Sequence, residues 1–535
     1  MWYLYWNNAQ NVYKRLPTEG DYSREEDDFD GLTDTNTETS QEEIVALLRD
    51  RINEDNVIPH VINSFRHYGS GWSLLHKAIN SSLRNKGMII ETLLERGANP
   101  NCLDAAGLTP LHSAVELYEV EEDDDTTKNI VQLLLKFGAD PNSNDIVNGK
   151  TPLHSLLNKY SENEDTDNVT LDIGIIALLL HFKADPNGKD KDGNTPFHYA
   201  IMAPNYENLI NLLLLYKGDI QSKNHNGETL IFYIPYHVLV SRTKLTNFFK
   251  FLLEKGVDIT IQNNLGQTFM NELLRGETIW HCKEWSCKNL AKIIAPLGID
   301  IYKKDLKGND CIHTSLKKGN FKLVFINDKY NYFLKYGLNF TGKNNKGKTY
   351  LHCASRSGNK ELVEFLIDQG LSIHDKTNDG KTCLHYAAQS DNKELVEFFI
   401  EQGLNIQDKT TKGQTCLHLA APCGDKASAV FFIQQGLSIH DKTLEGKTCL
   451  HLAVDAHNTD LIQFFLEKGL FLYDKTNDDK TCLYGVKSRK ISSELADLIN
   501  GTIISEFQYH KGSPLEVRER IKSYIKDGFN INAQD

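Results

Sequence analysis

A short phrase returns along this chain at intervals of 33 to 44 residues: glycine, any residue, threonine, a small residue, an apolar residue and histidine. It reads Gly-Leu-Thr-Pro-Leu-His at 107–112 and Gly-Lys-Thr-Cys-Leu-His at 380–385. Its last position falls at 76, 112, 154, 198, 232, 271, 313, 352, 385, 418, 451 and 484, and the final five are 33 residues apart. Such a period indicates stacked supersecondary units. It disfavours an enzyme, because stacked units present long surfaces rather than one deep pocket.

Each unit carries signals for two helices. Thr382 stands where a hydroxyl can cap the free amides of a helix start, as do Thr349, Thr415 and Thr448 in their units. Pro110 follows its threonine at the first helical position, where the missing N–H costs nothing. A second run, 395–400, has apolar residues at helical spacing, and Gly403 ends it in the left-handed conformation. No unit buries both sides of its helix pair, so the apolar core must run through the stack.

In its period and its Thr-Pro-Leu-His opening, the phrase resembles the ankyrin repeat. The resemblance covers roughly residues 70 to 500 and implies an all-α fold, an ankyrin-type solenoid of helix–turn–helix repeats joined by short β-hairpin loops. It also implies that the repeated histidine hydrogen-bonds between neighbouring loops and fixes their geometry. Partners of this family usually meet the concave face, which is built from hairpin tips and exposed first-helix positions.

Composition shifts divide the chain into six expected regions. They are a disordered acidic segment (1–39), a degenerate helical cap (40–70), repeats with acidic insertions (71–220), degenerate repeats with a basic waist (221–340), regular 33-residue repeats (341–500) and an incomplete repeat (501–535). Because the final segment reads as a second helix and a hairpin entry, the expectation is a fragment or an array that continues.

Charge is distributed unevenly along the array. Acidic insertions near 119–125 and 162–167 fall between the two helices of their units, whereas residues 300–348 are rich in lysine. Each stretch is read either as solvated surface or as a docking site, for a basic and an acidic partner respectively. In the regular repeats, Asp375 and its equivalents adjoin Lys376 and its equivalents, which predicts a ladder of exposed ion pairs, each worth about 0.2–1 kcal/mol.

The ten cysteines do not read as a disulfide framework. Cys383, Cys416, Cys449 and Cys482 recur at one position, so neighbours should lie roughly 8–10 Å apart. A disulfide needs Cα atoms within about 7 Å. Free thiols fit a reducing compartment, and no apolar run is long enough to span a membrane. A cytoplasmic protein without membrane insertion is therefore expected. The net charge of −13 disfavours nonspecific binding to nucleic acid.

Two patterns invite a metal interpretation. In Cys383 and His385, and in the equivalent Cys-x-His pairs, the side chains diverge by about 200° on a helix, so the pair does not share an ion easily. His281, Cys282 and Cys287 supply only three irregularly spaced ligands, and core packing is the favoured reading. The chain shows no phosphate-binding or catalytic motif. We expect no enzyme, cofactor, resident metal or small-molecule substrate.

The residue types that follow the alanine of the first helix vary from repeat to repeat, whereas the apolar core residues of the motif stay the same. These variable positions supply the expected protein-binding residues, with Tyr118 and Arg356 favoured because aromatic residues and arginine dominate interface energetics. The full set is Glu116, Tyr118, Met202, Lys317, Lys318, Arg356, Gln389 and Asp455.

The sequence therefore predicts a noncatalytic, monomeric scaffold that binds another protein on its concave face. The alternative is the targeting arm of a larger adaptor, effector or channel-linked protein. A metal-dependent enzyme centred on His281, Cys282 and Cys287 is the third hypothesis.

Overall fold

The computed structural model describes two compact units, which meet in the sequence between Asn264 and Leu265. The described residues are 62–64, 66, 69–81, 86–117, 125–162, 173–239, 242–275, 297, 299–317, 341–484, 498–499, 501–502 and 522. Most of the acidic N-terminal segment, the cap, the two insertions and the C-terminal repeat, together with Tyr118, Lys318, His281, Cys282 and Cys287, lie outside them.

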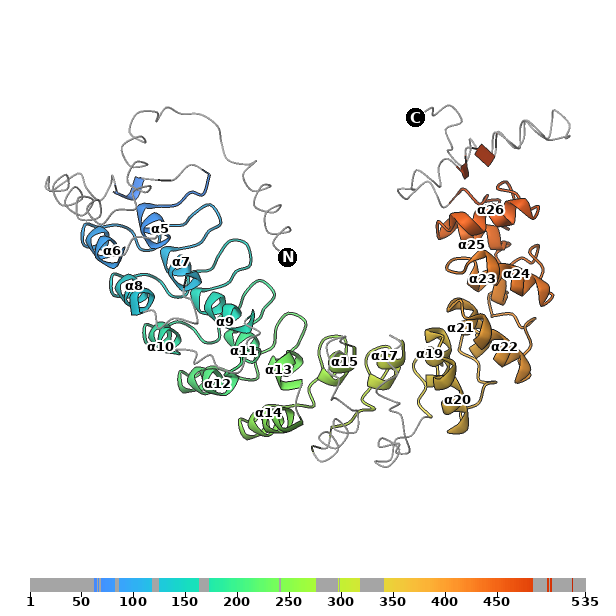
Figure 1. The fold of residues 1–535 in the computed structure, drawn as a ribbon, viewed down its shortest axis with the longest axis horizontal. Helices are drawn as coiled ribbons and strands as arrows, with labels where there is room; N and C mark the ends of the chain where they lie inside the picture. The colour runs from blue at the N-terminus through green and yellow to red at the C-terminus, as the bar shows by residue number, and fades with distance from the viewer. Residues whose placement is uncertain are drawn as a thin grey trace. The chain divides into compact units, whose positions relative to one another are not determined.

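The first unit is a stack of antiparallel helix pairs (Figure 1). Its second helices form one row, and the hairpin loops project from the opposite side of the first helices. The first helices are α5 (Leu74–Ile79), α7 (Pro110–Glu116), α9 (Pro152–Glu162), α11 (Pro196–Ala200) and, in the last pair, the 3-10 helix Leu230–Phe232 with α13 (Tyr236–Leu239). The second helices are α6 (Lys86–Glu95), α8 (Asp125–Lys136), α10 (Gly174–His181), α12 (Tyr206–Leu215) and α14 (Arg242–Glu254).

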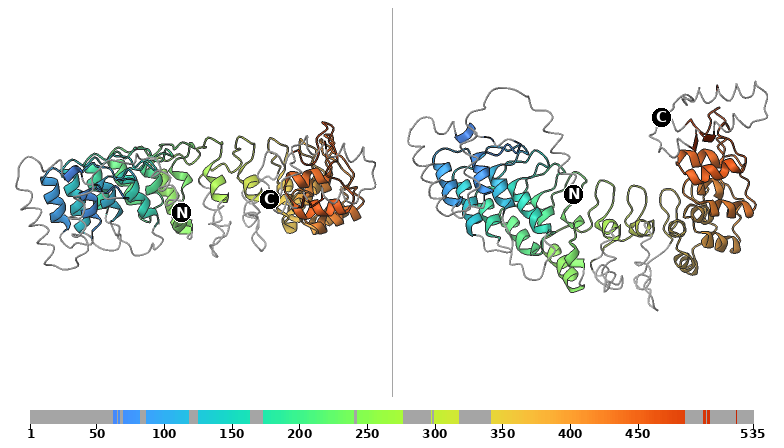
Figure 2. Two further views of the ribbon diagram at one scale, coloured as in Figure 1. Left: turned by 90° about the horizontal axis from the view of Figure 1, so that it is seen from above. Right: turned by 45° about the horizontal axis from the view of Figure 1, so that its top comes forward.

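The second unit repeats the same arrangement from α19 onward, and these helix pairs stack in the right-hand view of Figure 2. Its first helices are α15 (Phe269–Arg275), α17 (Cys311–Lys317), α19 (Tyr350–Ser357), α21 (Cys383–Gln389), α23 (Cys416–Ala420) and α25 (Cys449–Asp455). Its second helices are α20 (Lys360–Asp368), α22 (Lys393–Glu401), α24 (Lys426–Gln434) and α26 (Thr459–Glu467). The described residues contain isolated antiparallel bridges but no extended strand, which confirms the all-α solenoid.

The first helices α7, α9, α11, α19, α21, α23 and α25 each begin with a capping box formed by a threonine and a histidine. In α21, the backbone N–H of Thr382 donates to Nδ1 of His385 (3.2 Å), and the threonine hydroxyl lies 2.9 Å from the same nitrogen. Because a backbone N–H occupies Nδ1, the ring proton sits on Nε2, which donates to the carbonyl of Asp408 in the next repeat (3.2 Å). The predicted cap and the predicted bond between neighbouring loops are both present.

The same box recurs in both units. His76, His112, His154 and His198 each donate from Nε2 to a carbonyl of the following hairpin, as does His352 in the second unit. Each of these imidazoles is buried. One side chain thus caps its own helix and ties that helix to the next repeat.

The hairpins are joined by backbone hydrogen bonds from one tip to the next. In the second unit, Asn378 N donates to Lys346 O (3.0 Å), and Thr411 N donates to Asp379 O (3.0 Å). Gly380 takes a φ of 74° at one tip, and a Cβ there would lie 2.9 Å from Thr411 N. Glycine is required at this tip both for its backbone conformation and for the close approach of the next hairpin.

Two further ladders link successive repeats. In the first unit, the Asn101 and Asn142 amides each donate to the loop carbonyl after the next second helix (2.9 Å each) and accept from a backbone N–H of that loop (2.7 Å each). In the second unit the predicted Asp–Lys ladder is present between repeats. Its pairs are Lys343–Asp375 (3.1 Å), Lys376–Asp408 (3.0 Å) and Lys409–Asp441 (3.5 Å).

The core runs lengthwise through each stack. Leu384, Leu395 and Phe399 of one repeat are fully buried, as are Leu417 and Leu450 at the same position as Leu384 in later repeats. On the second-helix side, a lysine of each repeat lies over a phenylalanine ring of the next. The ammonium-to-centroid distances are 5.4 Å for Lys360–Phe398, 5.0 Å for Lys393–Phe431 and 5.5 Å for Lys426–Phe464.

The buried histidines predict how stability depends on pH. Burial lowers the pKa of His154, His352 and His385 from 6.5 to about 4. Between these values the unfolded chain binds protons that the native chain does not bind. The free energy of unfolding should therefore fall as the pH is lowered from about 6.5 to about 4, measured by urea denaturation across this range.

A matched variant separates this effect from general acid unfolding. Asn271 occupies the histidine position of its own repeat, where its Oδ1 accepts from both the N–H (2.9 Å) and the hydroxyl (3.0 Å) of Thr268. His385→Asn should keep this cap, lose the bond to Asp408, and show a smaller loss of stability over the same pH interval. Equal losses in the variant and the wild type would contradict the assignment.

Candidate functional site

The described residues of the predicted binding set share one structural position. Each lies seven residues after the cap of its first helix, as Glu116 follows Thr109 and Arg356 follows Thr349. We call this the N7 position. It holds Glu116 and Met202 in the first unit, and Lys317, Arg356, Gln389 and Asp455 in the second. Glu116, Lys317 and Arg356 are exposed, and Met202, Gln389 and Asp455 are half-buried.

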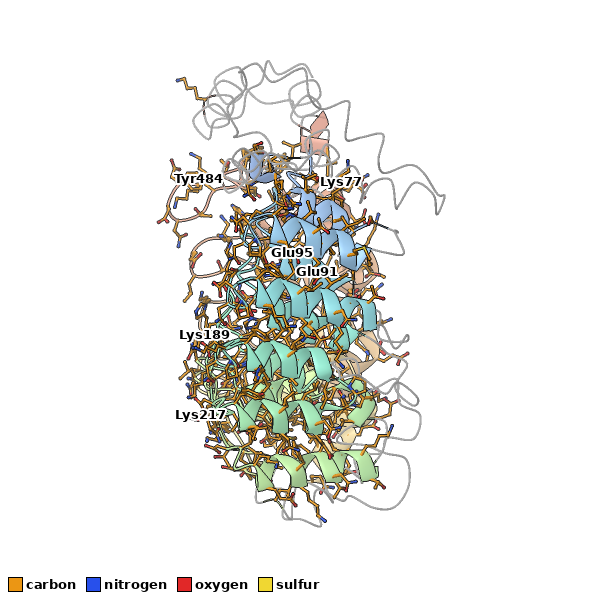
Figure 3. The ribbon with its side chains drawn as sticks, turned by 90° about the vertical axis from the view of Figure 1, so that its left-hand side faces the viewer. Lys77, Glu91, Glu95, Lys189, Lys217 and Tyr484 are labelled. Atoms are coloured by element: carbon orange, nitrogen blue, oxygen red, sulfur yellow. The ribbon has the colours of Figure 1, made fainter. Side chains whose placement is uncertain are left out.

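A second position borders N7 on the same face. It is the residue directly before the cap, at the base of the hairpin, and we call it the base position. Lys447 at the base and Asp455 at N7 of one repeat form an ion pair of 2.9 Å, so the two positions lie side by side. We call the surface formed by the base and N7 residues the loop-side face. It is distinct from the second-helix side, where Glu91 and Glu95 of α6 face the viewer in Figure 3, while Lys189 and Lys217 lie at the loop edge.

In the first unit this face is bordered by carboxylates that the hairpins themselves require. Asp104 Oδ1 accepts from Ala106 N (2.9 Å) and Leu108 N (2.8 Å), and Asp190 Oδ1 accepts from two backbone N–H groups in the same way. The Tyr199 hydroxyl also donates to Asp190 (2.6 Å). Each aspartate closes a turn and leaves a negative charge beside the base position.

In the second unit the same turns are closed by neutral side chains from Asn344 onward. Asn344 Oδ1 accepts from Lys346 N (3.0 Å) and Lys348 N (2.9 Å). Thr377 and Thr443 accept from the N–H of the base residues Lys381 (3.0 Å) and Lys447 (3.1 Å). The turn chemistry is equivalent, but the residue that closes the turn carries no charge, and a carboxylate beside a base lysine comes from elsewhere in the loop, as Asp379 does for Lys381 (3.5 Å). The charge of the residue that closes the turn therefore differs among repeats along the loop-side face, from Asp104 to Asn344 and Thr377.

Cations gather on this face around the ring of Tyr386. The Lys348 ammonium lies 4.6 Å from the ring centroid and the Lys381 ammonium 5.8 Å from it. Burial lowers the pKa of Lys348, and the positive charges of Arg356 and Lys381 act in the same direction. Lys381 has a carboxylate partner in Asp379 at 3.5 Å. This arrangement favours anionic ligands.

The thiols and histidines of the repeats are structural in the described part of the chain. Cys383, Cys416 and Cys449 are free and buried, which confirms the prediction made from their spacing. Across the residues that the structure describes, no group of three or more histidine, cysteine or acidic side chains is placed to hold a metal ion. The described helices include none that is long and apolar enough to cross a membrane.

Comparison with known families agrees with this geometry. A family model described as ankyrin repeats (3 copies) matches residues 38–145, 120–224 and 172–263, and one described as ankyrin repeats (many copies) matches 351–400 and 384–433. The chain belongs to the ankyrin-repeat family. In this chain the threonine and the histidine of the family's repeated motif form the capping box, and the histidine also bonds to the next repeat.

Relatives share the repeat over different lengths. Human rabankyrin-5 is 24% identical over 362 residues, which cover 68% of this chain and 26% of that protein. The fowlpox virus ankyrin repeat protein FPV115 is 25% identical and matches 58% of this chain and 59% of its own length. The fowlpox protein FPV230 is 28% identical over 36% of this chain and 88% of its own length. The match thus spans about a quarter of rabankyrin-5 and about three fifths of FPV115.

Sequence reasoning found the N7 position but missed the base position. Lys348 belonged to the lysine-rich stretch that was interpreted as solvated surface or as a docking site for an acidic partner, and Lys381 to the regular repeats, where it had no predicted role. The available signal was their fixed place before the cap threonine, which recurs in Lys150 and Lys447.

The thiols provide a test of this burial pattern. Cys423 is exposed, whereas Cys383 and Cys416 are buried and burial raises their pKa to about 12. N-ethylmaleimide should modify Cys423 of the native protein well before Cys383 and Cys416, and urea should remove the difference. Peptide mass spectrometry after timed labelling measures the order. Labelling of Cys383 as fast as Cys423 would show that the helix pairs do not pack as described.

Proposed function

We propose that this chain is a noncatalytic scaffold that binds a partner protein on the concave, loop-side face of its repeats. Ankyrin repeats generally mediate protein–protein interaction, and this chain belongs to that family. Beyond this general role, we propose which face of the repeats binds, which residues form the contact and that the ligand is another protein. The mechanism is rigid presentation of a surface, so that little conformational entropy is lost when the partner docks.

The observation that carries the proposal is variation at N7 within a constant frame. The cap, the histidine and the buried leucine recur in α7, α19, α21 and α25, while N7 changes from Glu116 to Arg356, Gln389 and Asp455. The frame does not fix the residue type here: Glu116 and Arg356 are exposed, and Gln389 and Asp455 are half-buried at the edge of the core. A recognition surface needs side chains that differ in chemical type but are held at fixed positions.

The chemistry-bearing residues of the described repeats favour binding over catalysis. Burial lowers the pKa of His385 to about 4 and raises that of Cys383 to about 12, so neither is poised near neutral pH. Both ring nitrogens of His385 are occupied by the cap and by the next repeat. We infer a cytoplasmic setting for the same chain, since its buried thiols are free.

A second candidate is the targeting arm of a larger adaptor, effector or channel-linked protein. The observation that favours it is the short share of rabankyrin-5, 26%, that the chain matches. In this case the loop-side face has the same role, and the effector chemistry belongs to the rest of the protein.

Site-specific photocrosslinking tests the proposed face. A benzophenone amino acid replaces Met202 or Gln389 at N7 in the full chain, and Glu91 or Glu394 on the second-helix side in matched controls. After irradiation in lysate of the native cell, mass spectrometry should find one set of proteins linked at both N7 positions and absent from the controls. Equal linking at N7 and control positions would remove the loop-side face from the proposal.

A further inference from the structure

We propose that the loop-side face of α17, α19 and α21 binds an acidic peptide segment of a partner protein, with one of its carboxylates held between Lys348 and Arg356. This inference rests on the proposed function and assigns the chemistry of the partner to part of that face. We define the cationic face as Lys317, Lys348, Arg356 and Lys381.

The packing of the second unit brings these residues together. Helix α17 packs against α19, and α19 packs against α21. Lys317 and Arg356 occupy the same N7 position in the last turns of α17 and α19, so they are neighbours along one row. Lys348 and Lys381 are the base residues of α19 and α21, and both ammonium groups approach the one ring of Tyr386.

Two nearby carboxylates pair with residues outside the cationic face, and a third pairs with its member Lys381. Asp310 is buried, where it pairs with His313 (3.0 Å) and accepts from the Tyr350 hydroxyl (2.6 Å). Asp375 forms an ion pair with Lys343 (3.1 Å), and Asp379 forms one with Lys381 (3.5 Å). None of the ion pairs among the described residues involves Lys317, Lys348 or Arg356.

Another repeat of the same unit shows what is missing. There the base residue Lys447 and the N7 residue Asp455 form an ion pair of 2.9 Å. In the repeat of α19 the same two positions hold Lys348 and Arg356, which repel each other. An external carboxylate between them would restore the charge balance that Asp455 provides within its own repeat. Arg356 can also bind such a carboxylate through two parallel hydrogen bonds.

The size and setting of the face favour a peptide over nucleic acid. Tight binding to a phosphate backbone draws on many cations along an extended track, whereas this face holds a small group. The chain as a whole carries a net charge of −13, which repels a long polyanion more strongly than a short acidic segment of fewer charges. A short acidic segment concentrates its negative charge where the cations are.

Fluorescence anisotropy with defined probes tests the inference on the full chain. The probe is a fluorescein-labelled peptide of alternating glutamate and glycine, and its counterpart has glutamine in place of glutamate. We expect the wild type to prefer the glutamate peptide by at least about tenfold at low salt, with affinity falling as salt is added. A labelled single-stranded oligonucleotide of similar length should bind less tightly than the glutamate peptide.

The decisive variant is Arg356→Asp, which gives the repeat of α19 the same pair of residue types as Lys447 and Asp455. We expect it to lose at least about tenfold in affinity for the glutamate peptide. Because Arg356 is exposed, the midpoint of urea-induced unfolding should be the same for the Arg356→Asp variant and the wild type. Lys409→Asp, which changes net charge equally but lies in the ion-pair ladder, should retain wild-type affinity.

Three results would overturn the inference. They are equal affinity for the glutamate and glutamine peptides, unchanged affinity in Arg356→Asp, or tighter binding of the oligonucleotide. If the wild type shows no preference for the glutamate peptide but the N7 positions crosslink to a partner, the proposed scaffold function is retained and only the inference of an acidic partner is wrong. If the crosslinks fail as well, the proposed function is wrong.

Discussion

Most of the described repeats depend on the hydrogen bond that an imidazole makes to the next repeat, although in α23 and α25 the equivalent Nε2 atoms of His418 and His451 are buried without a hydrogen-bond partner. In α21, His385 accepts from its own cap at Nδ1 and donates to the carbonyl of Asp408 at Nε2. The ring is buried, so neither bond competes with water, and breaking either would leave an unsatisfied polar group in the core. Together with the backbone bonds between hairpin tips, the imidazole bond joins successive repeats in a fixed register on the loop-side face.

Two repeats of the second unit show how much change the bond tolerates. Asn271 keeps the cap and directs its amide nitrogen to the Thr314 hydroxyl (3.3 Å). In α17 the cap is Asp310, whose carboxylate lies 3.0 Å from Nδ1 of His313. Burial opposes ionisation of Asp310, yet its pKa is lowered, because His313 and Tyr350 donate hydrogen bonds to it. The geometry of the next hairpin survives, with His313 Nε2 3.2 Å from Lys348 O.

The sequence predicts what is local and misses what joins distant residues. Thr382, Pro110 and Gly403 act within their own helices, so their roles follow from spacing alone. The Asn101 amide reaches the carbonyl of Gly138, and Lys348 reaches the ring of Tyr386, and neither partner is a neighbour in the chain. The exact 33-residue period made the Asp–Lys ladder predictable, because it places equivalent residues in register.

The candidate site was predictable in position and not in chemistry. Variation after the alanine marked N7, but sequence alone does not show that Lys447 neutralises Asp455 while Lys348 and Arg356 remain unbalanced. In the folded chain, the lysines of residues 300–348 fall into two groups, those with partners in neighbouring loops and those of the cationic face. Lys304 donates to the carbonyl of Lys343, and Lys343 pairs with Asp375, whereas Lys317 and Lys348 belong to the cationic face. Side-chain partners, not composition, decide which charges are available to a ligand.

The central claim is that the frame carries stability and the N7 residues carry specificity, so the two are separable. Replacing Lys317 and Arg356 together with glutamate tests it most directly, because both side chains are exposed and neither belongs to the frame. The account predicts an unchanged urea midpoint and a preference that moves from a glutamate–glycine peptide to a lysine–glycine peptide. A lowered midpoint with unaltered preference would contradict it.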